Sequence, residues 1–346
     1  MSGKPYRVIQ FATGNVGSRA MRTIIEHPQM ELVGLWVSSE VKVGKDAGEL
    51  CGLGPVGIKA TNSVEELLAI DADCVSYMRQ GFDCDEVCAI LASGKNISTT
   101  LADLNYPQMM DPGVRSRLEE ACRQGGTSLY ATGSSPGFST EALAIPLLSM
   151  QRRLDLITID EFADVSSRDS REMLFSIMGF GQPMGEFEQH RADHLKAHFA
   201  NSMGVVADAM GLSFDEIEAK GEYSAARQDT VIAAGTVPKG TVGAMRTSII
   251  GKHKGKPVMQ MRLNWYVTTD IEHSDWNLRE SGWRVLVEGD TPMNVEITYP
   301  VAPEHYAAFT PGLTAHRTVN AIPVVCEAEP GLLTTLTMPQ VVPVFE

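Results

Sequence analysis

In residues 1–135, short apolar runs alternate with stretches in which apolar positions recur every three or four residues. Short apolar runs indicate buried strands, and the longer spacing indicates helices with one buried face. Such alternation is typical of a doubly wound parallel sheet, which binds its ligand at the carboxyl ends of the strands. Strands are expected at 8–11, 31–39, 73–78, 96–100 and 128–131, and helices after Gly17 and at 63–69, 84–93 and 112–124.

Residues 151–310 show a different pattern. Residues 154–162 (LDLITIDEF) alternate like a half-buried strand, and residues 184–210 are mostly of helical type. Paired alternating runs around short polar turns predict two β-hairpins, and alternation on one face predicts a sheet covered on one side. The second part of the chain is therefore expected to be α+β with a mainly antiparallel sheet. The predicted hairpins pair 242–252 with 258–267 and 283–288 with 294–299.

The first predicted strand runs into a turn with the sequence TGNVG at residues 13–17. Gly14 would let the backbone approach a pyrophosphate, and Gly17 would let the following helix pack closely on the strand. The N-terminus of that helix would offer free N–H groups and the positive end of its dipole to phosphates. We therefore predict a dinucleotide site, although Ala12 replaces the first glycine of the full GxGxxG fingerprint; a plain tight turn is the alternative. The predicted phosphate-binding residues are Thr13, Gly14, Asn15, Val16 and Gly17.

The end of the second predicted strand bears on the choice of cofactor. An NAD-specific enzyme usually holds the ribose 2′-hydroxyl with Asp or Glu at this point. Here the strand is expected to end at Ser38 and Ser39, with Lys42 and Lys45 close behind. Hydroxyls and a cation suit a 2′-phosphate better than a carboxylate would. We therefore expect NADP bound by Ser38, Ser39 and Lys42, with NAD as an alternative; under a second interpretation the lysines are simply solvated.

Composition limits the class of protein. The 346 residues leave room for two domains, and 43% hydrophobic with 21% charged residues is ordinary for a globular protein. A formal net charge of −14 argues against a nucleic acid partner. No apolar run approaches the roughly 20 residues that span a membrane, and the N-terminus lacks the apolar segment of a signal peptide. The six scattered cysteines suit reduced thiols, so we expect a cytoplasmic protein without a membrane partner.

Four short segments of the chain match a known family. They are 11–17 (FATGNVG), 43–50 (VGKDAGEL), 133–138 (GSSPGF) and 320–323 (NAIP), and the resemblance spans nearly the whole chain. The chain is similar to the dihydrodipicolinate reductase-like oxidoreductases, and most of all to the branch of the 2,4-diaminopentanoate dehydrogenase and native amine dehydrogenases. The resemblance implies a Rossmann domain and a sheet-based substrate and dimerisation domain. It also implies reduction, with NAD(P)H, of imines formed from ketones and ammonia, or the reverse oxidative deamination.

Several further cofactor contacts follow from this resemblance. It implies that the SPGF loop, with Ser135 and Pro136, lies against the nicotinamide. A Gly/Pro loop after a parallel strand is also in the right place for that role. Thr100, at the end of its predicted strand, is assigned to the same site. Asn320 would hydrogen-bond the cofactor if the C-terminal tail folds back, whereas a satisfied buried Asn is the alternative.

The chain departs from the family at two points. Dihydrodipicolinate reductases carry a His-His and Lys signature after the first strand of the second domain, and residues 161–167 (EFADVSS) lack it, which excludes the lysine-pathway reaction. The amine dehydrogenases place a carboxylate, usually Glu, after the strand that ends here at Thr100, where this chain has Asp103. Reductive amination needs a group that holds ammonia and moves protons, so Asp103 is the catalytic candidate. A helix N-cap is the alternative role for Asp103.

Candidates for the substrate pocket are less specific. Tyr106 is a candidate proton donor or pocket wall, with packing beside Pro107 as the alternative. Asp164 would polarise the substrate or lie solvated at a strand end. A methionine-rich wall would accept varied hydrophobic ketones, but core packing explains the same cluster. The cluster residues are Met173, Phe175 and Met178.

Three histidines recur at every fourth position of the predicted helix over 184–210. They are His190, His194 and His198. Two such histidines on one face can hold zinc, but no HExxH motif and no third type of ligand accompany them. We therefore expect a solvated or interface face and no metal.

These observations predict two domains and one reaction class. We expect a Rossmann domain at 1–150, an α+β substrate domain at 151–310, and a tail at 311–346, helical over 311–326, that packs back onto the first domain. The expected function is NAD(P)H-dependent reductive amination of ketones or aldehydes by a homodimer. An imine or carbonyl reductase that does not handle ammonia, and an NADP-binding sensor without catalysis, are the alternatives.

Overall fold

A computed structural model describes residues 3–345, and the chain divides into two compact units. Unit 1 contains the residues up to Ala142 together with those from Thr310 onwards, and unit 2 contains Leu143–Phe309. The sequence-based boundaries were drawn at 150 and 310. Among the helices of residues 3–345, none combines the length and the apolar character that a membrane crossing requires.

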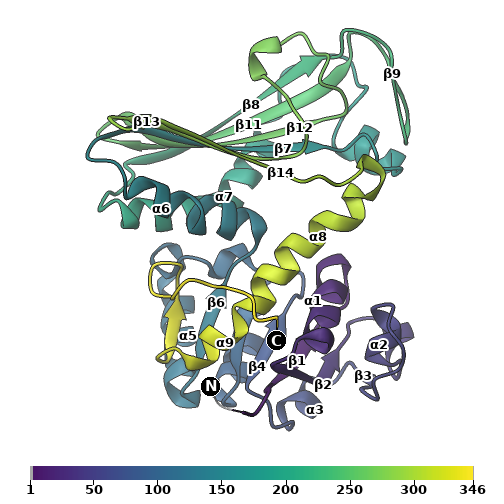
Figure 1. The fold of residues 1–346 in the computed structure, drawn as a ribbon, viewed down its shortest axis with the longest axis vertical. Coiled ribbons are helices and arrows are strands. Elements are labelled where there is room, and N and C mark those ends of the chain that lie inside the picture. Colours follow the sequence, from purple (N-terminus) through teal and green to yellow (C-terminus); the bar gives the residue numbers. More distant parts are fainter. Residues whose placement is uncertain (1–2, 346) are drawn as a thin grey trace. The chain divides into compact units, whose positions relative to one another are not determined.

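Unit 1 is built on a seven-stranded sheet in which every pairing is parallel (Figure 1). The strand order is β15-β6-β5-β4-β1-β2-β3. Strand order reverses at β1, which is paired with β2 on one side and β4 on the other, and this is the point where doubly wound sheets bind ligands. The predicted Rossmann fold is confirmed. The strands are β1 (Tyr6–Phe11), β2 (Met30–Trp36), β3 (Ala60–Thr61), β4 (Cys74–Tyr77), β5 (Asn96–Thr99), β6 (Ser128–Ala131) and β15 (Gly331–Leu333).

Helices cover both faces of this sheet because each presents one apolar stripe. On one face, α3 (Val64–Leu68), α4 (Cys84–Ala92) and α5 (Pro112–Gly125) bury Leu67, Ile90 and Leu118. On the other face, α1 (Asn15–Glu26) packs with the C-terminal part of α8 (Pro303–Asn320) and with α9 (Ile322–Glu327). The residues that α8 and α9 bury there are Ala315, Val319 and Ile322.

Three predicted element boundaries are wrong. Strand β2 ends at Trp36 rather than Ser39, and Ser39 is the N-cap residue of the 3-10 helix η1 (Glu40–Lys42). The helix predicted over 184–210 begins only at Gln189. The tail helix begins at Pro303, eight residues before its predicted start, and continues through Pro311. Pro311 discouraged a helix start further upstream, because a proline inside a helix removes one backbone hydrogen bond and crowds the carbonyl four residues before it.

Unit 2 contains a six-stranded sheet in the order β14-β13-β7-β12-β11-β8. All of its pairings are antiparallel except that of β7 with β12, so the prediction of a mainly antiparallel sheet is confirmed. Strand β8 was not predicted because four charged residues alternate along it and hide its buried positions. The strands are β7 (Leu154–Asp164), β8 (Glu216–Ala225), β11 (Val242–His253), β12 (Lys256–Tyr266), β13 (Gly282–Gly289) and β14 (Met293–Thr298), and a small separate sheet pairs β9 (Thr230–Ile232) with β10 (Gly235–Val237).

Two helices cover one face of the six-stranded sheet, α6 (Ala144–Leu148) and α7 (Gln189–Ala209) (Figure 1). Alternate strand residues such as Ile159, Met261 and Val285 point to this face and pack against Phe199 and Met203 of α7. The intervening strand residues, including Asp160, lie on the opposite face. The exposed side of α7 carries His190, His194 and His198.

Candidate active site

The turn between β1 and α1 has the geometry that its sequence predicted. Ala12 takes the left-handed conformation, with φ at +71°, where the full fingerprint has a glycine. A Cβ at Gly17 would lie 2.3 Å from the carbonyl oxygen of Ala12, so only glycine lets α1 pack this closely. The buried Gln10 fixes the turn, because its Nε2 donates to the carbonyls of Phe11 and Ala12 at 3.1 and 3.0 Å.

The N-terminus of α1 is open. Gly14 is the N-cap residue, no side chain caps the helix, and its first turn contains no acidic residue. A Cβ at Gly14 would meet no atom within 4 Å. The first N–H groups of a helix lack partners within it and carry the positive end of the helix dipole. The space and the donors at residues 13–17 therefore fit the pyrophosphate of a dinucleotide.

Lys42 lies against the same turn. Its Nζ is 2.9 Å from Oγ1 of Thr13 and 3.2 Å from the carbonyl oxygen of that residue. Ser38 is exposed just beyond β2, and Ser39 is half-buried at the start of η1. The structure therefore brings the predicted Lys42 into contact with the phosphate turn. Ser38 and Ser39 lie just after the end of β2, the strand paired with β1.

An arginine that sequence reasoning missed lies at the carboxyl ends of β2 and β4. The Arg79 guanidinium lies over the Trp36 ring, 5.3 Å from its centre, and pairs with Glu86 at 2.7 Å. The Tyr77 hydroxyl donates to the same carboxylate at 2.6 Å, and burial raises the pKa of Tyr77. Phe11 stacks between Trp36 and Tyr77. The available signal was a basic residue two positions after the strand that pairs with β1.

The SPGF loop follows β6 and is tied to α8. Oγ of Ser134 and Oγ1 of Thr314 are 2.7 Å apart, and Oγ of Ser98 donates to the carbonyl of Thr318 at 2.7 Å. The buried hydroxyl of Ser135 has no partner within residues 3–345, and the Asn320 amide forms no side-chain hydrogen bond in that range. Pro136 and Thr100 are half-buried beside them at the ends of β6 and β5.

Unsatisfied polar atoms at the carboxyl edge of a parallel sheet are where a ligand would find donors and acceptors. The free hydroxyl of Ser135, in the loop that follows β6, meets that description, and Asn320 at the end of α8 offers a further unengaged amide. The loop after β6 and the end of α8 therefore fit the polar part of a cofactor.

Asp103 lies in the 3-10 helix η2 (Ala102–Leu104), directly after β5. Its carboxylate is exposed and forms no hydrogen bond or ion pair with any other residue that the structure describes. The alternative role as a helix N-cap is wrong, because Leu101 precedes η2 and Asp111 caps α5 by accepting from two backbone N–H groups. Tyr106, by contrast, is buried. The structure therefore places an unengaged carboxylate at the ligand-binding edge of the sheet.

The hydrophobic residues expected to line a substrate pocket lie elsewhere in unit 2. Phe175 and Met178 are half-buried against a cluster that contains Leu174 and Val242, and Met173 is 40% exposed. Met173 and Phe175 lie in the π-helix η5 (Glu172–Ile177) and Met178 directly follows it, and the cluster also contains Ile232 of β9 and Val237 of β10. The packing alternative therefore describes the contacts of Phe175 and Met178 in this structure.

Asp164, at the end of β7, lines a cavity of about 350 Å³ within unit 2. The walls come from the ends of β7 and β14, the turn before β13 and the start of α8. None of the hydrophobic candidates at 173–178 is among the residues that line it within the described chain. The lining residues are Asp164, Ser166, Ser167, Glu280, Ser281, Tyr299, Pro300, Val301, Ala302 and Tyr306.

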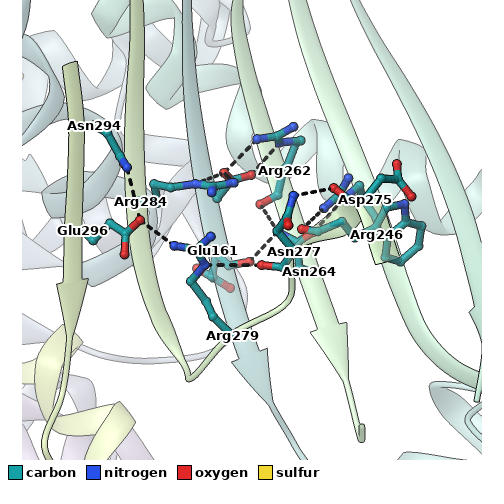
Figure 2. A network of polar contacts seen from close by, with 12 residues as sticks. Glu161, Arg246, Arg262, Asn264, Asp275, Asn277, Arg279, Arg284, Asn294 and Glu296 are labelled. Carbon is teal, nitrogen blue, oxygen red and sulfur yellow. Dashed lines mark hydrogen bonds and ion pairs between the residues drawn. The ribbon is translucent and has the colours of Figure 1, made fainter. Parts of the chain in front are cut away.

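The sheet face opposite α7 carries a network of arginines (Figure 2). Asp160 is fully buried and accepts from Arg262 at 2.5 and 2.8 Å and from Arg284 at 2.8 Å. Arg246 donates to Asn264 at 2.6 Å, and burial, with Arg262 nearby, lowers the pKa of Arg246 to about 10. This face is therefore built from polar side chains that hold one another in place.

Two family models match the chain, in agreement with this fold. Residues 138–345 match the 2,4-diaminopentanoate dehydrogenase C-terminal domain. Residues 8–76 match the N-terminus of dihydrodipicolinate reductase. The second match contains the phosphate turn, and the first contains all of unit 2 together with α8 and α9.

Comparison with individual related proteins agrees with these family matches. The chain is 30% identical to an amine dehydrogenase of Streptomyces virginiae, over 96% of this chain and 95% of that protein. It is 22% identical to the 2,4-diaminopentanoate dehydrogenase of Acetoanaerobium sticklandii, over 76% and 71% of the two chains. The amine dehydrogenase structure from Mycobacterium smegmatis shares the fold, with a TM-score of 0.75, 18% identity and 98% of each chain covered. The resemblance drawn from the four sequence segments is thereby confirmed.

Proposed function

The chain belongs to the 2,4-diaminopentanoate dehydrogenase family, to which amine dehydrogenases are related, and from this premise we propose that it is an NAD(P)H-dependent amine dehydrogenase. The proposed reaction joins a ketone or aldehyde with ammonia and reduces the product to a primary amine, with release of water. The reverse direction is the oxidative deamination of the amine. The observation that carries the proposal is the open N-terminus of α1 behind the turn at residues 12–17, because it fits a dinucleotide.

The cofactor would be held by this chain's backbone and by few side chains. The N–H groups at the start of α1 would bind the pyrophosphate, and Thr13 would be held toward it by Lys42. Lys42, Ser38 and Ser39 support NADP as the preferred cofactor, because a cation and hydroxyls suit a 2′-phosphate. Ser135, Pro136, Thr100 and Asn320 would contact the nicotinamide end. When bound, the reduced nicotinamide supplies the hydride.

Asp103 would supply the proton chemistry. Its exposed and unpaired carboxylate can accept hydrogen bonds from ammonia and from the amine nitrogen. It can take a proton from the attacking ammonia and return one to the hydroxyl group that leaves as water. Asp164, which lines the cavity in unit 2, is proposed to contact the substrate.

Turnover in the presence and absence of ammonia tests this function. NADPH and NADH oxidation would be followed against a panel of ketones and aldehydes, each with and without concentrated ammonia. Consumption that depends on ammonia is the expected result. Turnover without ammonia would instead indicate a carbonyl reductase, and cofactor binding without any turnover would indicate a sensor.

Asp103 variants test the role of the carboxylate. We expect Asp103→Asn to lower kcat for amination by about 10²- to 10⁴-fold, the usual contribution of a general base, with unchanged NADPH binding. Asp103→Glu, which restores the residue usual in the family, should keep activity. Asp208→Asn, at an exposed carboxylate on α7, is the matched control. Equal amination by wild type and Asp103→Asn would exclude the proposed role.

We also propose that two copies associate through the sheet face opposite α7. Helices α6 and α7 cover the other face of the sheet, and the arginine network gives this one a fixed shape (Figure 2). Leu286, half-buried on the face, is a site for disruption: Leu286→Glu should convert a dimer to a monomer in light-scattering measurements. Val231→Glu, at an apolar residue 82% exposed on β9, should leave the dimer intact. A monomeric wild type would refute the proposal.

A further inference from the structure

The cavity at the end of β7 is lined by carboxylates and aromatic rings. It lies entirely within unit 2, and its volume of about 350 Å³ is enough for a small organic molecule. Asp164 and Glu280 contribute carboxylates, and Tyr299 and Tyr306 contribute rings. No Lys or Arg is among the described residues that line it. The cavity thus combines negative charge with aromatic surface.

Neither carboxylate is neutralised. Oδ1 of Asp164 accepts one hydrogen bond, from the backbone N–H of Ser166 at 2.9 Å. The exposed Glu280 forms no side-chain hydrogen bond or ion pair within residues 3–345. The neighbouring Arg279 is engaged elsewhere, because its guanidinium pairs with Glu296 and lies over the Phe162 ring (Figure 2). The negative charge at the cavity therefore remains available to a ligand.

The aromatic wall is held in place from behind. The Tyr299 ring meets Trp283 edge-on at 5.6 Å and Phe309 at 5.2 Å, and Tyr306 meets Phe309 at 5.9 Å. Burial raises the pKa of both tyrosines, so their hydroxyls stay neutral in the physiological range.

A third carboxylate adds to the negative potential of this region. Glu161 is fixed by the indole N–H groups of Trp265 and Trp283, each at 3.4 Å. Its charge also contributes to raising the pKa of both tyrosines that line the cavity. The cavity therefore has three carboxylates around it and aromatic faces that are themselves electron-rich.

We propose that this cavity is a binding site for a small organic ammonium ion. Carboxylates accept charge-assisted hydrogen bonds from an ammonium group, and a cation is attracted to the face of a tyrosine ring. The same groups repel anions and offer a neutral alcohol no comparable attraction. That the ammonium is the amine of the reaction rests on the proposed function, whereas its binding does not.

Calorimetric titration of the full chain without cofactor tests this site. The probes are n-butylammonium, 1-butanol and butyrate, which share size and shape but differ in charge. We expect n-butylammonium to bind at least ten-fold more tightly than the other two, and to bind less tightly as salt increases. Equal binding of 1-butanol, or tighter binding of butyrate, would overturn the proposal.

Variants locate the binding. Asp164→Asn should weaken n-butylammonium binding by about ten-fold or more, the scale of a charge-assisted hydrogen bond. Asp169→Asn, at an exposed carboxylate outside the cavity lining, should not change it. Glu280→Gln, at an exposed turn, serves as a second test if Asp164→Asn does not fold. Unchanged binding in the folded cavity variants would place the ammonium elsewhere and refute the assignment.

The same preparations separate this proposal from the proposed function. Ammonium binding at the cavity without ammonia-dependent turnover would refute the reaction and leave the site. If turnover depends on ammonia but the Asp164 and Glu280 variants bind n-butylammonium as tightly as wild type, the site is refuted and the proposed reaction stands.

Discussion

The candidate site of unit 1 is formed mainly by backbone atoms, whereas that of unit 2 is formed by side chains. In unit 1, the backbone forms the phosphate turn: a left-handed Ala12, a close approach at Gly17 and the uncapped start of α1. In unit 2, side chains form the cavity and the network on the sheet, and they come from residues as far apart as Asp160 and Tyr306. A site formed by the backbone depends on where small residues lie along the sequence. A site formed by side chains depends on which residues lie close together in the folded chain.

Two buried carboxylates show the same difference. Asp46 in unit 1 is 1% exposed and accepts from the backbone N–H groups of Gly48, Val56 and Gly57, each at 2.9 Å. Asp160 in unit 2 is fully buried and accepts from two arginines. Lys59, which pairs with Asp46 at 3.8 Å, is 65% exposed and stays solvated when the carboxylate is removed, whereas the arginines around Asp160 would be left with largely buried and uncompensated charges. The two units should therefore respond very differently to loss of a carboxylate.

The largest effect is expected from Asp160→Ala. Removal of one partner from a buried ion pair typically costs about 3–5 kcal/mol, because the remaining charge is buried and unpaired. The free energy of unfolding from urea titration, at two protein concentrations, measures it. Asp155→Ala is the control on the same strand: its pair with Arg153 is exposed on both sides and should contribute less than about 1 kcal/mol. Similar losses of unfolding free energy in the two variants would show that the buried ion pairs of Asp160 stabilise the chain no more than an exposed ion pair does.

The next effect separates two glycines of the phosphate turn. A Cβ at Gly17 would clash with the Ala12 carbonyl at 2.3 Å, so Gly17→Ala should destabilise the fold by about 1–3 kcal/mol and also impair NADPH binding. Gly14→Ala meets open space, so it should leave stability within about 0.5 kcal/mol and weaken only NADPH binding. Thermal unfolding and fluorescence titration with NADPH measure the two quantities. Full NADPH affinity in Gly14→Ala would mean that the pyrophosphate does not approach this residue.

The contrast between the units also explains what the sequence could predict. The strand, glycine turn and helix at residues 6–26 are local, so glycine spacing and apolar periodicity were sufficient to identify them. Arg79 was missed because its contact with Trp36 depends on β2 and β4 lying on either side of β1, which only the assembled sheet shows. The end of β2 was misplaced because Val37–Ser39 look like a strand, whereas in the structure Ser39 is the N-cap residue of a 3-10 helix that begins at Glu40.

Unit 2 was harder to predict for the same reason. Asp164 was identified because it ends an alternating strand, but its neighbours Glu280, Tyr299 and Tyr306 follow more than 110 positions later and have no common motif. The apolar cluster at 173–178 was predicted as a pocket wall because hydrophobic side chains suit a ligand and a core equally well, and the sequence did not show that they lie on a short helix over the core. The burial of Leu174 beside the half-buried Phe175 shows that much of it packs inward.

A smaller effect tests Lys42, a charged side chain that contacts the phosphate turn. Lys42 lies 2.9 Å from the Thr13 hydroxyl, and a 2′-phosphate would give its ammonium a strong partner. We expect Lys42→Met to weaken NADPH binding by about ten-fold, or about 1.4 kcal/mol, and to leave NADH binding nearly unchanged. The neighbouring exposed Lys45, changed to Met, is the control. Equal losses for both cofactors would assign Lys42 to the pyrophosphate turn rather than to the 2′-phosphate.

The smallest effect concerns pH and the backbone-bound Asp46. The N–H of Val56, together with those of Gly48 and Gly57, outweighs burial and lowers the pKa of this carboxyl below its ordinary value of about 4. A lowered pKa stabilises the folded chain above the unfolded-state pKa, and that stabilisation is lost as the pH falls through the folded-state pKa. Asp46→Asn should therefore be less stable than wild type by a constant amount from pH 7 to about pH 4.5, and the difference should shrink below about pH 4. Urea titrations of both proteins from pH 7 to pH 3 measure this. A difference in unfolding free energy that stays constant down to pH 3 would contradict this prediction. It would mean that the three N–H groups stabilise the carboxyl of Asp46 no more in its charged form than in its neutral form.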